Sequence, residues 1–352
     1  MDITDPVALQ AAFNAPWPDV PSSSPSEKEP EITVFHTAAS VRFYERHISF
    51  LGRSSEVNVQ GTKNVVSAAQ SVGATVLVYT STASIGIRNT RFLLWPWEKE
   101  PGRFVQVVDD NDAKEPRNHE DFCSNYTVSK LEAEKFVRAS DKKVTGKGTT
   151  ALLRTGCLRP GMSVYGPRGN TLSLYLSRRK NPSYLSRVAQ SSCFVENCVA
   201  AHLLYEQRLI ELLRPESKYP DIGGQAFTIA DSGPTPTYKD MFTILETLTK
   251  GECQFPSLSP TAMLLIAHAV ELYYRAQQTL SAAGRNWLPR VNDSLVKLQP
   301  SLFSLTLVHV VLDDSRARLP PEKGGLGYID AWTTMEGLYK TIQDYKSGAG
   351  HS

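Results

Sequence analysis

The chain has 352 residues, of which 41% are hydrophobic and 21% charged, and its formal net charge at pH 7 is +2. These values are ordinary for a globular protein with one large or two modest cores, and the small net charge argues against nucleic acid as the main partner. The five cysteines form no Cys-x-x-Cys pair, so the sequence suits a reducing compartment better than a disulfide framework. We expect no signal peptide and no membrane span, because no apolar run reaches ~20 residues.

The first part of the chain predicts a helix and then a strand. Asp5 and Pro6 are the N-cap and first-turn residues of a helix that we expect to end near residue 13. Residues 32–39 are β-rich and apolar, which predicts a buried strand that ends in small residues. His36 lies in this strand, where a hydrogen-bonded structural histidine is a better interpretation than a catalytic base.

A second helix and strand follow. Small and apolar residues at 57, 61, 65, 68 and 72 fall on one helical face, and Gly73 is placed to end the helix. The run 74–79 has the composition of a buried parallel strand, and three hydroxyl residues follow it directly. Open α/β sheets hold their ligands at the carboxyl ends of strands, so we expect a binding site at these hydroxyls. They are Thr80, Ser81 and Thr82.

Tyr126 and Lys130 stand four residues apart in a predicted helix, and Ala133 and Val137 continue the same face. A phenol and an ammonium at this spacing can share one pocket, where the ammonium would lower the pKa of the phenol from about 10. Such a tyrosine can serve as an acid or base near neutral pH. A solvated surface pair is the alternative, because many helices carry Tyr-x-x-x-Lys.

Three later segments complete the predicted organisation. Residues 88–122 predict a long loop over the site, where lids and substrate contacts collect. Their acidic run at 109–112 lacks the spacing of an EF-hand loop, so we expect a solvated turn and no metal. A third parallel strand is expected at 149–155. Residues 261–276 predict a helix with a broad apolar face, suited either to core or substrate-channel packing or to membrane contact.

Several motifs together resemble one family. Asn-Val-x-Gly-Thr-x-Asn-Val at 58–65, Val-Tyr-Thr-Ser-Thr at 78–82 and Tyr-Thr-Val-Ser-Lys at 126–130 resemble the extended short-chain dehydrogenase/reductase family. Leu-Arg-Pro-Gly at 158–161 and Val-Tyr-Gly-Pro at 164–167 are further matches. Within that family, the chain looks most similar to the branch of 3β-hydroxysteroid dehydrogenases and sterol-4α-carboxylate 3-dehydrogenases.

The resemblance implies an α/β fold with a Rossmann-like, doubly wound parallel sheet that is truncated at its N-terminus. Residues 1–167 would form the dinucleotide-binding domain without its first βαβ unit. Residues 168–346 would form a smaller substrate-binding part whose elements interleave with the first.

The resemblance also implies catalytic roles. Tyr126 would be the acid/base, and Lys130 would lower its pKa and bind the nicotinamide ribose. Thr82, or alternatively Ser81, would hydrogen-bond the reacting oxygen. Asn58 would help to hold Lys130 through a water, or would make only a side-chain–backbone bond.

The implied cofactor is NAD or NADP. Asp2 would contact its adenine, Tyr126 and Lys130 its nicotinamide ribose, and Pro160 would lie beside its carboxamide. The 352 residues contain no Gly-x-x-Gly-x-x-Gly turn after a strand, which would hold the pyrophosphate. We therefore expect residues 1–352 alone to bind a dinucleotide poorly, and the choice between NAD and NADP stays open.

The implied reaction is oxidation of a 3β-hydroxyl on a sterol, steroid or triterpenoid-like substrate, or reduction of the ketone. A 4α-carboxylate on the substrate would be lost as carbon dioxide, and Arg88, Arg91 and Arg168 are candidates to receive it. One alternative is a reductase of another secondary alcohol or ketone in a biosynthetic pathway. Others are a sugar-nucleotide epimerase, which suits the apolar segments less well, and a non-catalytic fold relative without the dinucleotide site.

The expected partner is a hydrophobic, sterol-like small molecule, and no nucleic acid is expected. Peripheral contact with a membrane and formation of a homodimer stay open. We expect a cytoplasmic protein, with the endoplasmic reticulum membrane as the surface for any peripheral contact.

Overall fold

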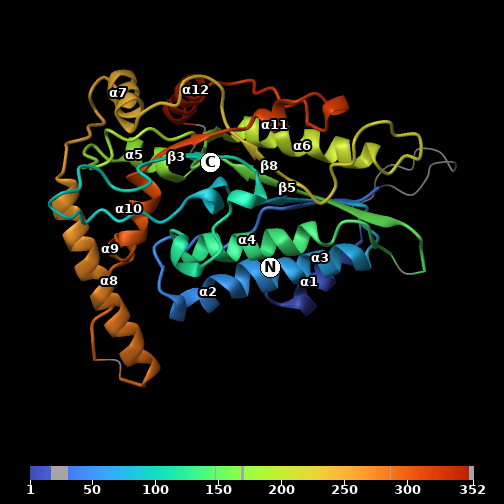
Figure 1. Ribbon diagram of the computed structural model, residues 1–352, viewed down its shortest axis with the longest axis horizontal. Coiled ribbons are helices and arrows are strands. Elements are labelled where there is room, and N and C mark those ends of the chain that lie inside the picture. The colour runs from blue at the N-terminus through green and yellow to red at the C-terminus, as the bar shows by residue number, and fades with distance from the viewer. Residues whose placement is uncertain (17–30, 147, 168–169, 286, 349–352) are drawn as a thin grey trace.

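A parallel sheet crosses the molecule, with helices packed on both faces and one long helix that projects from the body (Figure 1). This is the predicted α/β class. The computed structural model describes residues 1–16, 31–146, 148–167, 170–285 and 287–348.

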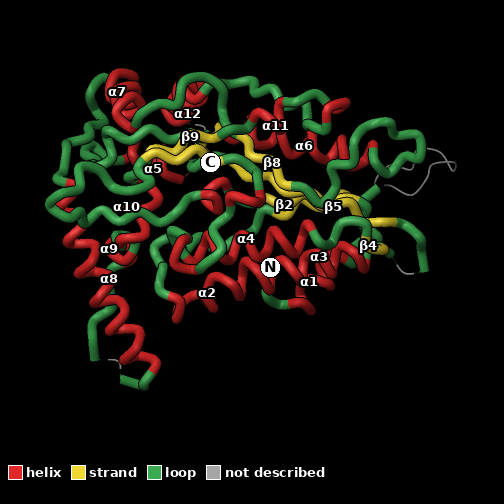
Figure 2. Tube along the Cα trace, in the orientation of Figure 1, coloured by secondary structure: helices red, strands yellow, loops and turns green. Residues whose placement is uncertain are grey.

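Four parallel strands form the central sheet, in the spatial order β1 (Thr33–His36), β2 (Val76–Thr80), β5 (Leu152–Pro160) and β8 (Ala226–Ile229). A short strand, β4 (Lys143–Val144), pairs antiparallel with the start of β5. The yellow strands in Figure 2 run through the middle of the molecule between layers of red helix.

This sheet confirms the prediction of adjacent parallel strands at 32–39, 74–79 and 149–155, although β5 starts at Leu152 and continues to Pro160. Parallel strands in register end at a common edge. The hydroxyls that follow β2 therefore lie beside the end of β5, where ligands of open sheets bind.

One face of the sheet is covered by α1 (Pro6–Phe13), α4 (Asn125–Arg138) and a continuous helical run between β1 and β2. Of the apolar face predicted for this run, Gly61, Val65 and Ala68 are buried and residues 57 and 72 are half-buried, and Val65 and Ala68 pack in the same core as Leu77 of β2. The run consists of η1 (Ile48–Phe50), α2 (Leu51–Ser55), the π-helix η2 (Glu56–Gly61) and α3 (Thr62–Ser71).

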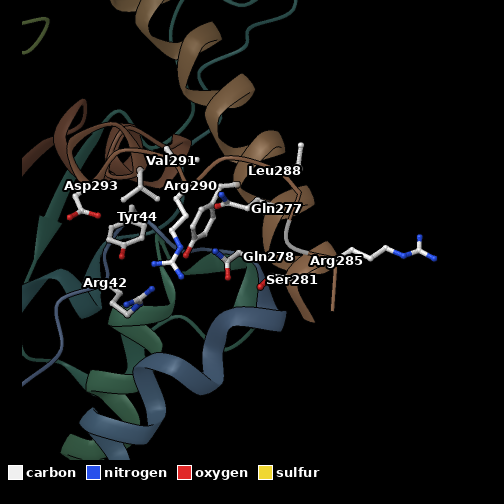
Figure 3. A pocket seen from close by; sticks show the side chains of 12 residues that line it. Arg42, Tyr44, Gln277, Gln278, Ser281, Arg285, Leu288, Arg290, Val291 and Asp293 are labelled. Atoms are coloured by element: carbon white, nitrogen blue, oxygen red, sulfur yellow. The ribbon is translucent and has the colours of Figure 1, made fainter. Parts of the chain in front are cut away.

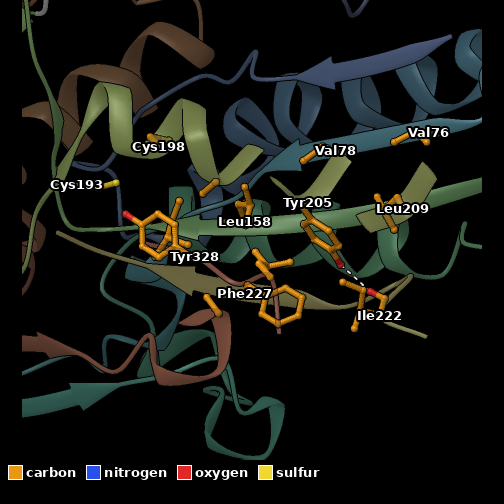
Figure 4. Packing of buried hydrophobic residues seen from close by; sticks show 14 residues of the cluster. Val76, Val78, Leu158, Cys193, Cys198, Tyr205, Leu209, Ile222, Phe227 and Tyr328 are labelled. Atoms are coloured by element: carbon orange, nitrogen blue, oxygen red, sulfur yellow. Dashed lines mark hydrogen bonds between the residues drawn. The ribbon is translucent and has the colours of Figure 1, made fainter. Parts of the chain in front are cut away.

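The other face is covered mainly by α6 (Val195–Glu211). Its Tyr205 packs between the strands beside Phe227 and donates a 2.8 Å hydrogen bond to the carbonyl of Ile222 (Figure 4). Gly156 in β5 leaves the space that the Tyr205 ring fills, since a Cβ there would collide with the ring. This close approach fixes the height of α6 above the sheet.

Two small parallel pairs lie outside the main sheet. β3 (Val105–Val108) pairs with β9 (His309–Leu312), and β6 (Val164–Tyr165) pairs with β7 (Cys193–Phe194). The first pair corrects the prediction of a lid at 88–122. Backbone pairing ties that segment to β9, and none of its residues lines the main cavity, a space of about 770 Å³ at the ends of β2 and β5.

The remaining helices are α5 (Asn170–Ser177), α7 (Tyr238–Leu248), α8 (Pro260–Ala282), α9 (Asp293–Val296), α10 (Pro300–Thr306), α11 (Ser315–Arg318) and α12 (Thr334–Lys346). Most of them build the end of the molecule from which one long helix projects, whereas α11 packs against β8. Short helical turns are η3 (Ala83–Gly86), η4 (Asp112–Lys114), η5 (His119–Asp121) and η6 (Pro321–Lys323). All five cysteines are free and buried.

The projecting helix is α8, which contains the helix predicted at 261–276. Leu264 and Ala267 on one face pack against Phe303 of α10, as the packing interpretation predicts. Leu265 and Leu272, on the opposite face, are exposed. No helix in the described part of the chain combines the length and apolar character that a membrane crossing requires.

Candidate active site

The start of α4 meets the ends of β2 and β5 at the carboxyl edge of the sheet. Ser124 caps the helix, because its hydroxyl accepts a hydrogen bond from the backbone N–H of Thr127. This cap fixes the first turns, so that Tyr126 and Lys130 line the same cavity as Thr82. The three residues singled out in the sequence are thus brought together.

The Tyr126 phenol is held by Thr82 rather than by Lys130. Its hydroxyl hydrogen-bonds the Thr82 side chain, but burial dominates and raises the pKa of Tyr126 to about 12. The predicted lowering of this pKa by Lys130 is wrong for the present arrangement. The Nζ of Lys130 instead donates to the Thr80 carbonyl at 2.6 Å and lies 4.1 Å from the centre of the Tyr79 ring.

Lys130 is almost wholly buried, and this environment changes its charge. Burial lowers the pKa of Lys130 to about 7, although the nearby Glu134 carboxylate opposes the shift. The amine is therefore divided between its charged and neutral forms near neutral pH. A ligand that brings negative charge or a hydrogen-bond acceptor to Nζ would favour the charged form.

A buried ion network lies behind the site. Ser81 donates from its hydroxyl to Glu134 at 2.6 Å. Arg159 binds the same carboxylate through Nε at 3.0 Å and Nη2 at 2.6 Å, and it also reaches Glu115 at 2.5 Å. The sequence analysis missed this network, because Glu134 and Arg159 carry no local pattern that distinguishes a buried charge from an exposed one.

This network separates the roles of the two hydroxyl candidates. The Ser81 hydroxyl is engaged by Glu134, whereas the Thr82 hydroxyl contacts Tyr126 and lies 2.8 Å from the hydroxyl of Ser84. The geometry therefore favours Thr82 as the partner of a reacting oxygen.

A cavity of about 770 Å³ opens in front of Thr82, Tyr126 and Lys130. Lys130 is the only charged residue among its described lining residues. The wall opposite the site is largely apolar and aromatic, and it comes from segments far apart in the sequence. Its members are Val41, Phe43, Met162, Val164, Leu172, Tyr175, Tyr184, Leu185, Tyr238, Met241, Phe242, Leu245, Phe255, Leu302 and Leu305.

A family model described as the 3-beta hydroxysteroid dehydrogenase/isomerase family matches residues 29–252. The chain belongs to this family.

Relatives carry the same kind of name. The chain is 27% identical over 320 residues to an Arabidopsis thaliana protein named 3beta-hydroxysteroid-dehydrogenase/decarboxylase isoform 2, covering 89% of this chain and 48% of that protein. It is 31% identical over 192 residues to a Candida albicans protein named sterol-4-alpha-carboxylate 3-dehydrogenase, decarboxylating, covering 51% and 45%. The chain thus spans about half the length of these relatives.

A solved structure shows the same fold at low identity. The Bordetella bronchiseptica enzyme WbmG, solved in complex with NAD and UDP, superposes with a TM-score of 0.55. The comparison covers 99% of this chain and 79% of that one, at 17% sequence identity. This likeness supports the Rossmann-like, parallel-sheet fold of this 3-beta hydroxysteroid dehydrogenase/isomerase family member.

In this family member, the two other predicted cofactor residues lie in different places. Pro160 is buried at the end of β5 and lines the cavity, next to Gly161, whose added Cβ would lie 2.7 Å from the Ser192 backbone. Asp2 is exposed, lies outside the cavity lining and accepts hydrogen bonds from the backbone and side chain of Thr4, both at 2.9 Å. Its predicted contact with adenine stays a prediction.

The structural interpretation of His36 is supported. Its Nε2 lies 2.9 Å from the Thr62 hydroxyl, and burial lowers the pKa of His36 to about 3. Asn58 bonds both backbone groups of Ser40 and also donates to the Ser129 hydroxyl at 2.9 Å. These contacts agree with the side-chain–backbone alternative.

Two of the arginines considered for a substrate carboxylate, Arg88 and Arg91, do not line the cavity. Arg91 is paired with Glu98, and the guanidinium of Arg88 donates to the carbonyl of Lys114 at 2.9 Å. Arg168 lies outside the described residues.

Proposed function

We propose that this chain is an NAD(P)-dependent oxidoreductase that acts on a 3β-hydroxyl, or the corresponding ketone, of a sterol, steroid or triterpenoid-like substrate. The observation that carries this proposal is the placement of Thr82, Tyr126 and Lys130 on a cavity whose other lining residues are mostly apolar or aromatic. A flat hydrocarbon skeleton would bury its surface against the apolar wall while its one oxygen reaches Tyr126.

The proton chemistry belongs to Tyr126. With a pKa of about 12, its phenol is protonated at neutral pH and can donate a proton to the oxygen formed from a ketone. Oxidation of the alcohol requires the phenolate instead. A movement of Lys130 Nζ from the Thr80 carbonyl toward the phenol would stabilise that form. Thr82 would hold the reacting oxygen in place.

The residues present fit the nicotinamide half of a dinucleotide, which supplies the hydride when it is bound. Lys130 has a titratable amine whose observed hydrogen bond is to a backbone carbonyl, so it could turn to the ribose hydroxyls. Pro160 and Gly161 bring the backbone close to the same place. We retain Asp2 as the adenine contact, residues 1–167 as the dinucleotide-binding domain and residues 168–346 as the substrate part.

Decarboxylation of a 4α-carboxylate is the finer form of this proposal. It is supported by the names of the Arabidopsis and Candida relatives. Oxidation at C3 makes the acid a β-keto acid, and the electrons of the breaking C–C bond then pass to the new ketone. This step asks for no further catalytic group, which agrees with the lack of an arginine among the described lining residues.

The test is an assay of the protein expressed from its complete gene. We expect pregnenolone, a 3β-hydroxysteroid, to reduce NAD⁺ or NADP⁺, measured by absorbance at 340 nm, whereas UDP-glucose is neither oxidised nor epimerised, the latter measured by chromatography of the sugar nucleotide because epimerisation leaves no net NADH. Turnover of UDP-glucose alone would favour a sugar-nucleotide enzyme. Specific binding of steroid without turnover of any alcohol would favour the non-catalytic relative.

We further propose that α8 makes peripheral contact with a lipid surface. Its outward face exposes Leu265, Ile266, Leu272 and Tyr273, and Trp287 beyond the helix is 70% exposed. Aromatic and aliphatic side chains of this kind, on a helix with a polar flank, are typical of interfacial helices.

Contact of α8 with a lipid surface would also bring the substrate cavity close to the membrane. The buried face of α8 packs on α10, and Leu302 and Leu305 of α10 line the cavity, so a membrane-dissolved substrate would arrive close to its binding site. The alternative is that a second copy of the chain, rather than lipid, covers this face of α8 and forms a homodimer. We place the protein in the cytoplasm, at the endoplasmic reticulum membrane.

A further inference from the structure

A second cavity, of about 690 Å³, lies between the residues that follow β1 and the end of α8 with α9 (Figure 3). It shares no lining residue with the main cavity. Its lining is mostly polar: Arg42, Tyr44, Tyr274, Gln277, Gln278, Ser281, Arg285, Leu288, Arg290, Val291, Asp293 and Val296.

One short segment forms a wall of both cavities. Val41 and Phe43 line the main cavity, whereas Arg42 and Tyr44 line the second. Residues 41–44 end in a turn at Phe43 and Tyr44, and their side chains are divided between the two cavities, so this short segment is a wall that both cavities share. Anything that holds Arg42 or Tyr44 therefore also fixes the apolar side chains that face the substrate.

Arginine dominates the second cavity. The guanidinium groups of Arg42 and Arg290 point into the same hollow, whereas Arg285 extends away from it (Figure 3). Arg290 is exposed, and no hydrogen bond or ion pair joins it to another described residue. A guanidinium in a cavity without a carboxylate partner is suited to an anionic ligand.

The carboxylate nearest to Arg42 is already neutralised. Glu45 is buried and receives Arg42 through two hydrogen bonds of 2.8 and 2.9 Å, and it also accepts from Arg53 at 3.2 Å and from the Tyr274 hydroxyl at 2.7 Å. Two arginines thus share one carboxylate. Arg290 and the remaining acid of the lining, Asp293, are both exposed and balance in charge. The excess of positive charge therefore comes from Arg42 and Arg53 around the single Glu45 carboxylate.

The other polar groups add donors. The Gln278 carbonyl oxygen accepts from Arg53 at 2.7 Å, which leaves the amide nitrogen of Gln278 free to donate. The hydroxyls of Ser281 and Tyr44 also face this cavity. Several donors around two guanidinium groups match the oxygens of a phosphate group better than a neutral ligand.

We propose that this cavity binds the phosphate group of a phosphate-bearing ligand, between Arg290 and Arg42, and that the bound ligand braces residues 41–44 against the main cavity. The phosphate could come from a soluble metabolite or from a lipid headgroup. The phosphate site stands independently of the proposed reaction, whereas its effect on steroid binding rests on the proposed function.

The probe for the site is inorganic pyrophosphate, titrated calorimetrically into the protein expressed from its complete gene. Arg290→Ala should weaken binding by about 10-fold or more, since it removes a charge-assisted contact. Arg275→Ala is the matched control, because it removes an exposed arginine of α8 outside this cavity and should leave the affinity unchanged. Equal affinity in all three proteins, or competition between pyrophosphate and NADH, would overturn the separate phosphate site.

Vesicles separate the two sources of phosphate. Loss of binding by Arg290→Ala to phosphatidic acid vesicles, but not to phosphatidylcholine vesicles, would assign a lipid headgroup. Unchanged vesicle binding, with pyrophosphate binding lost, would assign a soluble ligand.

The bracing is measured through steroid affinity. Pyrophosphate should tighten pregnenolone binding in the wild type and not in Arg290→Ala, because coupling between two ligands is reciprocal. An unchanged pregnenolone affinity would overturn the bracing and leave the phosphate site intact. A protein that binds pyrophosphate but no steroid under any condition would count against the proposed function instead.

Discussion

At the scale of single residues, two neighbouring hydroxyls have different partners. Ser81 donates to the buried Glu134, whereas Thr82 contacts the Tyr126 phenol. Tyr126 and Lys130 also differ from the simple pair that their spacing predicts, because the Lys130 amine is turned to the Thr80 carbonyl. The site in its present arrangement is therefore set for proton donation.

Substitution of the two hydroxyls should separate catalysis from stability. Thr82→Val removes the partner of the reacting oxygen, and we expect turnover to fall by about 10-fold or more. Ser81→Ala should leave turnover near that of the wild type but lower the free energy of unfolding by about 1–2 kcal/mol, since a buried bond to a carboxylate is lost. Steady-state kinetics and urea titration test this, and the reverse pattern would assign the catalytic role to Ser81.

The buried Lys130 should make stability depend on pH. Its pKa is lowered from 10.5 to about 7 on folding, so between these values the unfolded chain binds the extra proton. The free energy of unfolding should therefore rise with pH across this window, and the contribution is smallest below pH 7. Lys130→Met should raise Tm at pH 6 by at least ~2 °C and remove this part of the rise. A difference between the two proteins that does not change from pH 6 to pH 10 would contradict the lowered pKa.

At the scale of elements, the ion network joins α4 to β5 and to the segment around η4. Arg159→Met leaves the carboxylates of Glu134 and Glu115 without their main buried partner, and breaking such a buried pair costs about 3–5 kcal/mol. Lys135→Ala is the control, because its ion pair with Glu115 is largely exposed and should matter by less than about 1 kcal/mol. Urea titration gives both values, and equal losses would show that the network does not bear on stability.

The elements themselves were partly predictable from the sequence. The strands were predictable because apolar β-rich runs such as 74–79 end in polar residues, and the start of α4 follows from its cap at Ser124. The aromatic wall was not, because Tyr184, Phe242 and Phe255 come from segments that only the fold brings together. The four-residue spacing of Tyr126 and Lys130 also could not show the direction of the Lys130 amine, because that direction is set by its hydrogen bond to the Thr80 carbonyl of β2.

At the scale of the whole molecule, α8 carries the proposed membrane contact. Replacing Leu265 and Leu272 together by serine should reduce flotation with phospholipid vesicles by about 10-fold or more, because two exposed apolar side chains no longer enter the lipid. The matched control replaces Val199 and Leu203, two exposed apolar residues of α6, by serine. Equal flotation of both variants would contradict the assignment. If the Leu265 and Leu272 variant changed from dimer to monomer while its flotation with vesicles stayed the same, the exposed face of α8 would be a contact with a second copy of the chain.

The account depends most on Tyr126, and the most direct measurement is the turnover of Tyr126→Phe with a 3β-hydroxysteroid in the protein expressed from its complete gene. The substitution keeps the ring and removes the acid/base, so kcat should fall by about 10²-fold or more while dinucleotide affinity changes little. Tyr339→Phe, an exposed tyrosine of α12, should behave as the wild type. Normal steroid turnover by Tyr126→Phe would contradict the proposed site.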